Sequence, residues 1–323
     1  SIPNEHWAFD YSIDYALNNL NSSSTQTINS HPYRNTILQS GTARYKSDRL
    51  TVLGRLLHSL YLNFSKFGKS ARNMRRFSPS VSLSYQLLED EELYVRASYK
   101  NIFRSPTFNE SYYFHYGSPD LLPESTDQYN IGVTWSKKTD KMRVQLTADG
   151  YYNHVKDMIV AVPYNMFIWT CINVGKVRVL GADVTVDGSY DLGHDQKLLF
   201  NGSYSYQKAE NRTTEESECY GNQIAYIPEH TGSIAIGWEN PIVSLSLHGS
   251  GLSSRWDNNQ HTEGSLIEGY WDTGITAYHT FCWSGQKLEV RFDIKNILNK
   301  QYEIVHFYPM PGRSWQASVK YQL

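Results

Sequence analysis

The chain has 323 residues, and its 30 Lys plus Arg nearly balance its 32 Asp plus Glu. This balance gives no sign of nucleic-acid binding, and no stretch reaches the ~18 consecutive apolar residues of a membrane-spanning helix. Aromatic residues make up 14% of the chain, and 25 residues are Tyr, whose amphipathic ring suits the boundary between membrane and water.

Apolar and polar residues alternate along much of the chain, which predicts β-strands because successive side chains of a strand point to opposite faces. In the last such segment Trp315, Ala317 and Val319 share one face. Together with the turn signals between segments, the alternation predicts about 14 strands. The clearest segments, in chain order, are residues 7–15, 81–86, 143–149, 243–248, 288–295 and 314–323.

Connections of two lengths alternate between these strands, as in outer-membrane barrels, which have short periplasmic turns and longer extracellular loops. We therefore expect an all-β fold, a transmembrane antiparallel β-barrel whose apolar face meets lipid and whose polar face lines water. In the alternative, a soluble all-β interaction protein, the apolar faces would be enclosed in a core. Tight turns are expected near residues 46–48, 89–91, 137–140, 192–195, 239–241 and 283–286. Long loops are expected near residues 18–32, 65–76, 102–125, 161–176, 208–227, 254–269 and 299–312.

Several segments resemble the TonB-dependent receptor family. Residues 99–110 (YKNIFRSPTFNE) and 117–130 (GSPDLLPESTDQYN) are similar to a stretch in which one strand rises into a loop and the next descends. Residues 293–302 (DIKNILNKQY) are similar to the family's penultimate strand, and residues 308–315 (YPMPGRSW) to the start of its last strand. The order and spacing of these segments fit the family over the chain from residue 76 onwards.

The resemblance implies a barrel of about 22 strands closed around an N-terminal plug domain. Because about 14 strands leave no room for the plug, we expect residues 1–323 to be the C-terminal portion of such a barrel, without the plug and the first strands. The chain starts without signal-peptide features, so a signal was removed or the chain begins inside a longer protein. The alternative is a self-contained passive outer-membrane channel of about 14 strands.

For function, the resemblance implies a receptor and transporter of the bacterial cell outer membrane and no enzyme. It implies that extracellular loops bind a scarce nutrient, cobalamin or an iron–siderophore complex, for uptake energised by the TonB complex through the missing plug. Outer-membrane lipid, lipopolysaccharide and a surface lipoprotein are the other partners that it implies, and no cofactor is expected. The residues themselves form no nucleophile elbow, paired helical His or glycine-rich phosphate loop.

Aromatic and polar residues gather in the predicted extracellular loops, where rings supply contact area and His or Arg orient a ligand. The alternative interpretation is an ordinary interfacial aromatic belt with loop packing. The eight candidate ligand-binding residues are Tyr112, Tyr113, Tyr116, Trp169, Arg255, Trp256, His306 and Tyr308.

Cys171 and Cys219 fall in consecutive predicted extracellular loops, where an oxidising environment allows a disulfide between them. Their geometry decides between a disulfide and two free thiols. The chain's three cysteines lack metal-ligand spacing, so no metal site is predicted.

Two further patterns have a functional and a structural interpretation. A basic cluster at Arg72, Arg75 and Arg76 either contacts phosphates of lipopolysaccharide or an anionic ligand, or is a solvated loop. Glycines inside predicted strands, such as Gly132 and Gly181, fit close packing or bending better than cofactor binding.

Overall fold

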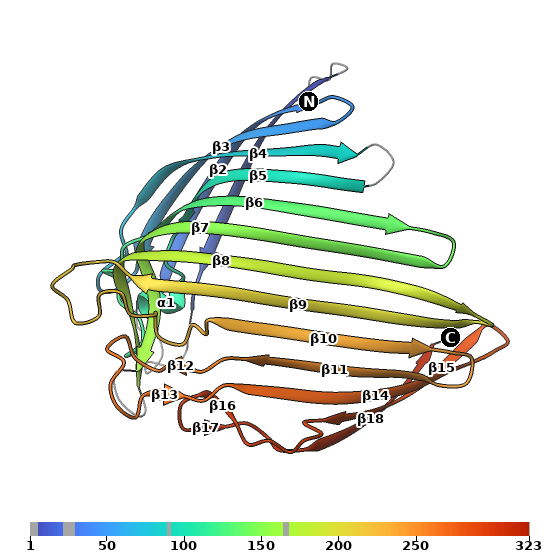
Figure 1. Ribbon diagram of the computed structural model, residues 1–323. Coiled ribbons are helices and arrows are strands. Elements are labelled where there is room, and N and C mark those ends of the chain that lie inside the picture. The colour runs from blue at the N-terminus through green and yellow to red at the C-terminus, as the bar shows by residue number, and fades with distance from the viewer. Residues whose placement is uncertain (1–5, 22–29, 89–91, 164–167, 323) are drawn as a thin grey trace.

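Figure 1 shows the computed structural model of the chain, which describes residues 6–21, 30–88, 92–163 and 168–322. One antiparallel sheet of 14 strands makes up most of it and curves into an open trough. This confirms the predicted all-β class and strand number. Each strand pairs with the next, except that β11 pairs with β14 and β15 with β18. The strands of this sheet are β1 (Trp7–Asn19), β2 (Pro32–Lys46), β3 (Leu50–Ser65), β4 (Met74–Leu88), β5 (Glu92–Arg104), β6 (Glu124–Lys138), β7 (Met142–Pro163), β8 (Trp169–Gly193), β9 (Gln196–Asn211), β10 (His230–Glu239), β11 (Ser244–Leu252), β14 (Tyr270–Trp283), β15 (Gln286–Lys295) and β18 (Ser314–Gln322).

Smaller elements lie inside the long connections. A short helix follows β5, and two small hairpins follow β11 and β15. In the described residues no helix has both the length and the apolar character needed to cross a membrane. These elements are α1 (Phe108–Tyr112), β12 (Arg255–Trp256), β13 (Leu266–Ile267), β16 (Glu303–Val305) and β17 (Tyr308–Pro309).

Neighbouring strands bring their apolar side chains to one face of the sheet. In the β4–β5 pair Val81 lies opposite Tyr99, and Val81 is 51% exposed. The other face is polar, and there Thr276 Oγ1 donates a hydrogen bond to Asp293 Oδ1 at 2.6 Å. In the described part of the chain no second large sheet covers the apolar face. This arrangement contradicts the soluble alternative, in which these side chains would be enclosed between packed layers.

The two edge strands, β1 and β18, differ from the rest of the sheet. In the residues described, β1 pairs only with β2 and β18 only with β15. Every residue of β18 is exposed, as are all but one of β1, so both faces of each edge are open. A self-contained channel of about 14 strands would require these edges to pair with each other, because open edges cannot be satisfied in lipid.

Connection lengths differ between the two ends of the strands, as predicted. Tight turns close one end, where His194 and Asp195 both have positive φ (55 and 56), as a type I′ hairpin turn requires. The predicted long loop near residues 161–176 is wrong, because β7 and β8 pair as far as Pro163 opposite Trp169. Its many β-branched residues favour this extended hairpin. Residues 22–29, 89–91, 164–167 and 323, which belong to predicted connections and to the predicted last strand, lie outside the described residues.

The strand glycines serve close packing, as predicted. A Cβ atom at Gly181 would lie 2.3 Å from Cζ of Tyr151 on the neighbouring strand. At Gly132 it would lie 1.9 Å from Oδ1 of Asp149. Larger neighbours therefore occupy the space that a side chain would need, and these glycines need no cofactor to explain them.

Candidate functional site

The connection between β5 and β6 is held by a capped helix and a three-residue ion-pair network. Thr107 and Glu110 form a capping box at the start of α1, in which each side chain accepts a hydrogen bond from the other residue's backbone N–H. Arg104 Nη1 contacts Glu110 Oε1 at 2.9 Å, and Arg104 Nη2 contacts Glu124 Oε2 at 3.3 Å. The segment that resembles the receptor family therefore anchors this loop to the ends of β5 and β6.

The electrostatics of this network favour an ionised carboxylate. Burial acts to raise the pKa of Glu110, but the backbone N–H of Thr107 and the Arg104 guanidinium outweigh it and lower that pKa below its usual value of 4.5. The loop is therefore held by a charge that persists well below neutral pH.

A second anchor comes from a residue far away in the sequence. Arg34 on β2 donates to the carbonyl oxygen of Pro106 at 2.8 Å, and its guanidinium lies over the ring of Phe108 at 5.1 Å. The hydroxyl of Tyr112 accepts a hydrogen bond from the backbone N–H of Ala71 at 2.7 Å. Tyr112 is thus engaged in joining two loops. Sequence reasoning missed Arg34, whose partner in the loop is 72 residues away.

Beside α1 the loop leaves an aromatic cleft of about 680 Å³. Three of the eight candidate residues meet there: Tyr113, Tyr116 and Trp169, from the α1 loop and the start of β8. Trp169 comes from the hairpin end that sequence reasoning predicted as loop. Phe114 and His115 also line the cleft, although they are not among the eight candidates. The full lining of this aromatic cleft is Thr107, Asn109, Glu110, Tyr113, Phe114, His115, Tyr116, Ile168 and Trp169.

One ring of the aromatic cleft is fixed by a buried thiol. A hydrogen bond with Cys171, together with burial, raises the pKa of Tyr116 to about 12. Cys171 packs with Leu121 and Ile159, and its backbone N–H donates to the carbonyl oxygen of Tyr116 at 2.8 Å. Tyr116 therefore presents a neutral phenol in a set position.

Few charged residues line the aromatic cleft. Among the described lining residues Glu110 is the only acidic one, and its carboxylate is already paired with Arg104. The described lining contains no Lys or Arg. Throughout the described chain no group of three or more His, Cys, Asp and Glu side chains is arranged to hold a metal ion. Rings and neutral polar groups thus dominate the surface that a ligand would meet.

Arg255 does not reach the aromatic cleft. Its side chain is buried, with 4% of the residue exposed, and it donates to the carbonyl oxygens of Glu303 and Ile304. It therefore joins the β12–β13 hairpin to β16. Its burial and partners give it a packing role, which corresponds to the structural interpretation of the loop residues.

The remaining three candidates lie in the connections that hold Arg255 and its carbonyl partners. His306 Nδ1 is 2.5 Å from Oδ2 of Asp257, so this ring is already partnered. Trp256 stacks on His261 with centroids 4.5 Å apart. Tyr308 is 58% exposed on β17. We refer to Arg255, Trp256, His306 and Tyr308 together as the hairpin cluster.

Tyr226 connects the aromatic cleft to the hairpin cluster. Its ring centroid lies 5.2 Å from that of Trp169, and its backbone N–H donates to the carbonyl oxygen of Trp256 at 2.7 Å. The connection between β9 and β10 thus bridges the two groups of candidates. Seven of the eight candidates thus form two groups in contact through this bridge. The first group surrounds the aromatic cleft, whereas His306 of the second group lines a smaller cleft of about 290 Å³.

The predicted disulfide between Cys171 and Cys219 is not formed, and both thiols are free. Cys171 packs against Leu121, whereas Val174, three residues along β8, packs with Ile224 of the connection that carries Cys219. Cys171 therefore packs with a different loop from the one that holds its predicted partner.

Comparison with known proteins agrees with this architecture. Residues 3–297 match the family model described as "TonB dependent receptor-like, beta-barrel". The chain belongs to the TonB-dependent receptor family. Its sequence is 23% identical over 306 residues to the vitamin B12 transporter BtuB of Photobacterium profundum, covering 90% of this chain and 46% of that protein.

Solved structures show the same fold. The copper transporter OprC superimposes with a TM-score of 0.71 at 16% identity, over 98% of this chain and 54% of OprC. The FrpB iron transporter from Neisseria meningitidis (F3-3 variant) superimposes with a TM-score of 0.70 at 16% identity, over 99% of this chain and 53% of FrpB. The chain thus spans about half the length of the relatives that it matches.

Proposed function

We propose that the chain is part of the barrel wall and the ligand-binding loops of a bacterial outer-membrane receptor that takes up a scarce nutrient. Its exposed apolar face supports residence in a membrane, because a contiguous apolar surface of this extent is costly in water. Its aromatic cleft, at the end of the strands where the long connections lie, supports the binding of an organic ligand.

The ligand that this cleft fits best is a large, ring-rich molecule without strong negative charge, such as cobalamin. Aromatic rings supply flat contact area, while anionic iron chelates call for Lys or Arg, which the described lining lacks. The preference for a ligand without strong negative charge rests on the absence of Lys and Arg from the described lining. The similarity to a vitamin B12 transporter agrees with it. An iron–siderophore complex is the second candidate, because the FrpB iron transporter has the same fold.

For transport, the proposal requires parts that residues 1–323 do not supply. We propose that further strands join β1 and β18 and that a plug domain fills the trough and contacts the TonB complex. The open edges of the sheet and the match to about half of each relative support this view. The 14 strands then form part of the wall of the transport passage, and the plug domain receives the energy for transport from the TonB complex.

Binding to the full-length protein tests the proposal. In detergent, cyanocobalamin should bind at least tenfold more tightly than a ferric catecholate complex. Trp169→Ala should weaken cyanocobalamin binding by about 30-fold, because loss of a central aromatic contact costs roughly 2 kcal/mol. Trp283→Ala is the matched control, since that exposed ring lies next to a tight turn at the other end of the strands, and it should leave affinity unchanged. Tighter binding of the ferric complex, or unchanged affinity in Trp169→Ala, would contradict the proposal.

A further inference from the structure

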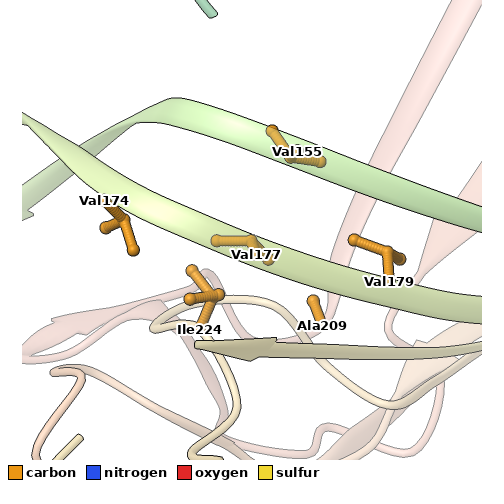
Figure 2. Packing of buried hydrophobic residues seen from close by; sticks show 6 residues of the cluster. All are labelled: Val155, Val174, Val177, Val179, Ala209 and Ile224. Carbon is orange, nitrogen blue, oxygen red and sulfur yellow. The ribbon is translucent and has the colours of Figure 1, made fainter. Parts of the chain in front are cut away.

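A group of cations lies on the apolar face of the sheet, at the end of the strands that carries the long connections. Val177 and Val179, which flank Arg178 along β8, are buried on the opposite face in the packing shown in Figure 2. Because side chains alternate along a strand, Arg178 points to the apolar face. The same reasoning from Val155 and Ala209 places the cations of β7 and β9. This cationic patch consists of Lys156, Lys176, Arg178, Lys208 and Arg212.

The cationic patch begins where an apolar band ends. Outward-facing Leu180, Val184 and Tyr190 on β8 are 54%, 39% and 42% exposed. From Tyr190 to Leu180 the strand advances ten residues, which is about 33 Å along the strand and, at the tilt usual for barrels, about 25 Å of depth. That depth equals the apolar band of an outer-membrane barrel. Arg178, the next outward residue, therefore lies at the level of lipid headgroups.

The pairing register of β7, β8 and β9 brings the cations of these strands to a similar depth at the edge of the apolar band. Arg178 lies opposite Glu210, and Lys208 lies opposite Leu180 at the upper limit of the band. One step further from the band, Lys156 of β7 lies directly opposite Lys176 of β8. Like charges that face each other across two strands are destabilising unless an anion joins them.

Nearby carboxylates balance only part of this charge. Glu210 is the common partner of Arg178, Lys208 and Arg212, with Nζ of Lys208 at 2.9 Å and Nη2 of Arg212 at 2.8 Å. In the described residues, neither Lys156 nor Lys176 forms an ion pair. Asp127, opposite His154 in the next strand pair, acts on Lys156 at longer range, as Glu229 acts on Lys208. The patch keeps an excess of positive charge.

We propose that the cationic patch binds the phosphorylated headgroup of a membrane lipid. Phosphate is the anion that suits it, because guanidinium groups bind phosphate through two parallel hydrogen bonds and ammonium groups add point charge. Lipid is the source, since the patch continues directly from the lipid-facing band, so the acyl chains of a bound lipid lie along Leu180 and its neighbours. This inference rests on the proposed location in the outer membrane. It also differs from the basic cluster of the sequence analysis, where Arg75 donates to His58 Nε2 at 3.0 Å.

The test measures lipid binding to the full-length protein in detergent by native mass spectrometry. Diphosphorylated lipid A should bind at least tenfold more tightly than its dephosphorylated form. Lys156→Gln combined with Lys176→Gln should weaken binding of the phosphorylated lipid by about 25-fold, because each cation near a lipid surface contributes about fivefold. Binding of the dephosphorylated lipid should not change. The matched control, Lys287→Gln with Lys320→Gln, removes two exposed charges from the polar face and should have no effect.

Three outcomes would overturn this proposal. The first is equal binding of phosphorylated and dephosphorylated lipid by the wild-type protein, and the second is an equal loss in the control variant. The third is competition by inorganic phosphate at matched phosphate concentration, which would assign the patch to the free anion. Heat-dependent electrophoretic mobility verifies that each variant is folded. Failure of the wild-type protein to insert into phosphatidylcholine vesicles would instead count against the proposed function, so the two failures are distinguishable.

Discussion

The aromatic cleft and the hairpin cluster contain the same kinds of side chain but use them differently. In the aromatic cleft, Tyr113 is 42% exposed and Trp169 lines the same open space. In the hairpin cluster, Arg255 is buried against backbone carbonyls and His306 is paired with Asp257. Residue type alone therefore does not separate a ligand surface from loop packing. What separates them is whether the polar atoms already have partners within the protein.

The largest effect is expected where a buried partner is removed. Arg255→Ala leaves two carbonyl oxygens without their charged donor, a loss worth roughly 2–3 kcal/mol. Amide hydrogen exchange in β13 and β16 should therefore accelerate by about 100-fold, while residues 113–116 of the aromatic cleft keep their rates. Arg313→Ala, at an exposed position, is the control and should change neither region. Faster exchange in the aromatic cleft would show that the two regions are not independent.

A smaller effect separates the two exposed tyrosines. Tyr113 lines the aromatic cleft, whereas Tyr308 is more exposed and lies outside it. Tyr113→Ala should weaken cyanocobalamin binding by about tenfold and Tyr308→Ala by less than about twofold, since a ring outside the enclosed surface contributes little. Isothermal titration of the full-length protein measures both. The reverse order would move the ligand surface to the hairpin cluster.

The smallest effect concerns pH at the base of the aromatic cleft. Because the folded protein holds the pKa of Glu110 below 4.5, the ionised carboxylate stabilises the α1 loop fully above pH 4.5, and this stabilisation is lost as pH falls through the lowered pKa. Exchange of α1 amides, corrected for the intrinsic rate, should stay level from pH 7 to pH 5 and then rise a few-fold below that range. In Glu110→Gln the step should disappear. A step near pH 6 in either protein would contradict this assignment.

Local periodicity explains why much of the wall could be predicted from the sequence. Residues such as Val81 and Trp315 occupy the face predicted from their neighbours two positions away, because alternation is set by the strand backbone itself. The tight turns could be predicted for a similar reason, because they depend on a few neighbouring residues in the sequence. The extension of β7 and β8 was not predicted, although β-branched residues are frequent on both sides of residue 164.

The candidate site was less predictable because it depends on contacts between distant segments. Arg34 holds a loop 72 residues away, and Arg255 binds carbonyl oxygens 48 and 49 residues away. No local pattern distinguishes these arginines from ones that face a ligand. The same limit explains why the disulfide prediction was wrong, since contacts between distant segments decide which loop packs against Cys171.

The most direct test of the account asks which face of a central strand meets lipid. Spin labels placed one at a time at residues 182–187 of β8, with the native cysteines replaced by Ser, report access to oxygen in lipid and to a nickel chelate in water. In bilayers containing the full-length protein, oxygen access should peak at Ala182, Val184 and Val186, and nickel access at Asp183, Thr185 and Asp187. Loss of this two-residue period, or nickel access that peaks at Ala182 and Val184, would contradict the claim that the apolar face meets the membrane.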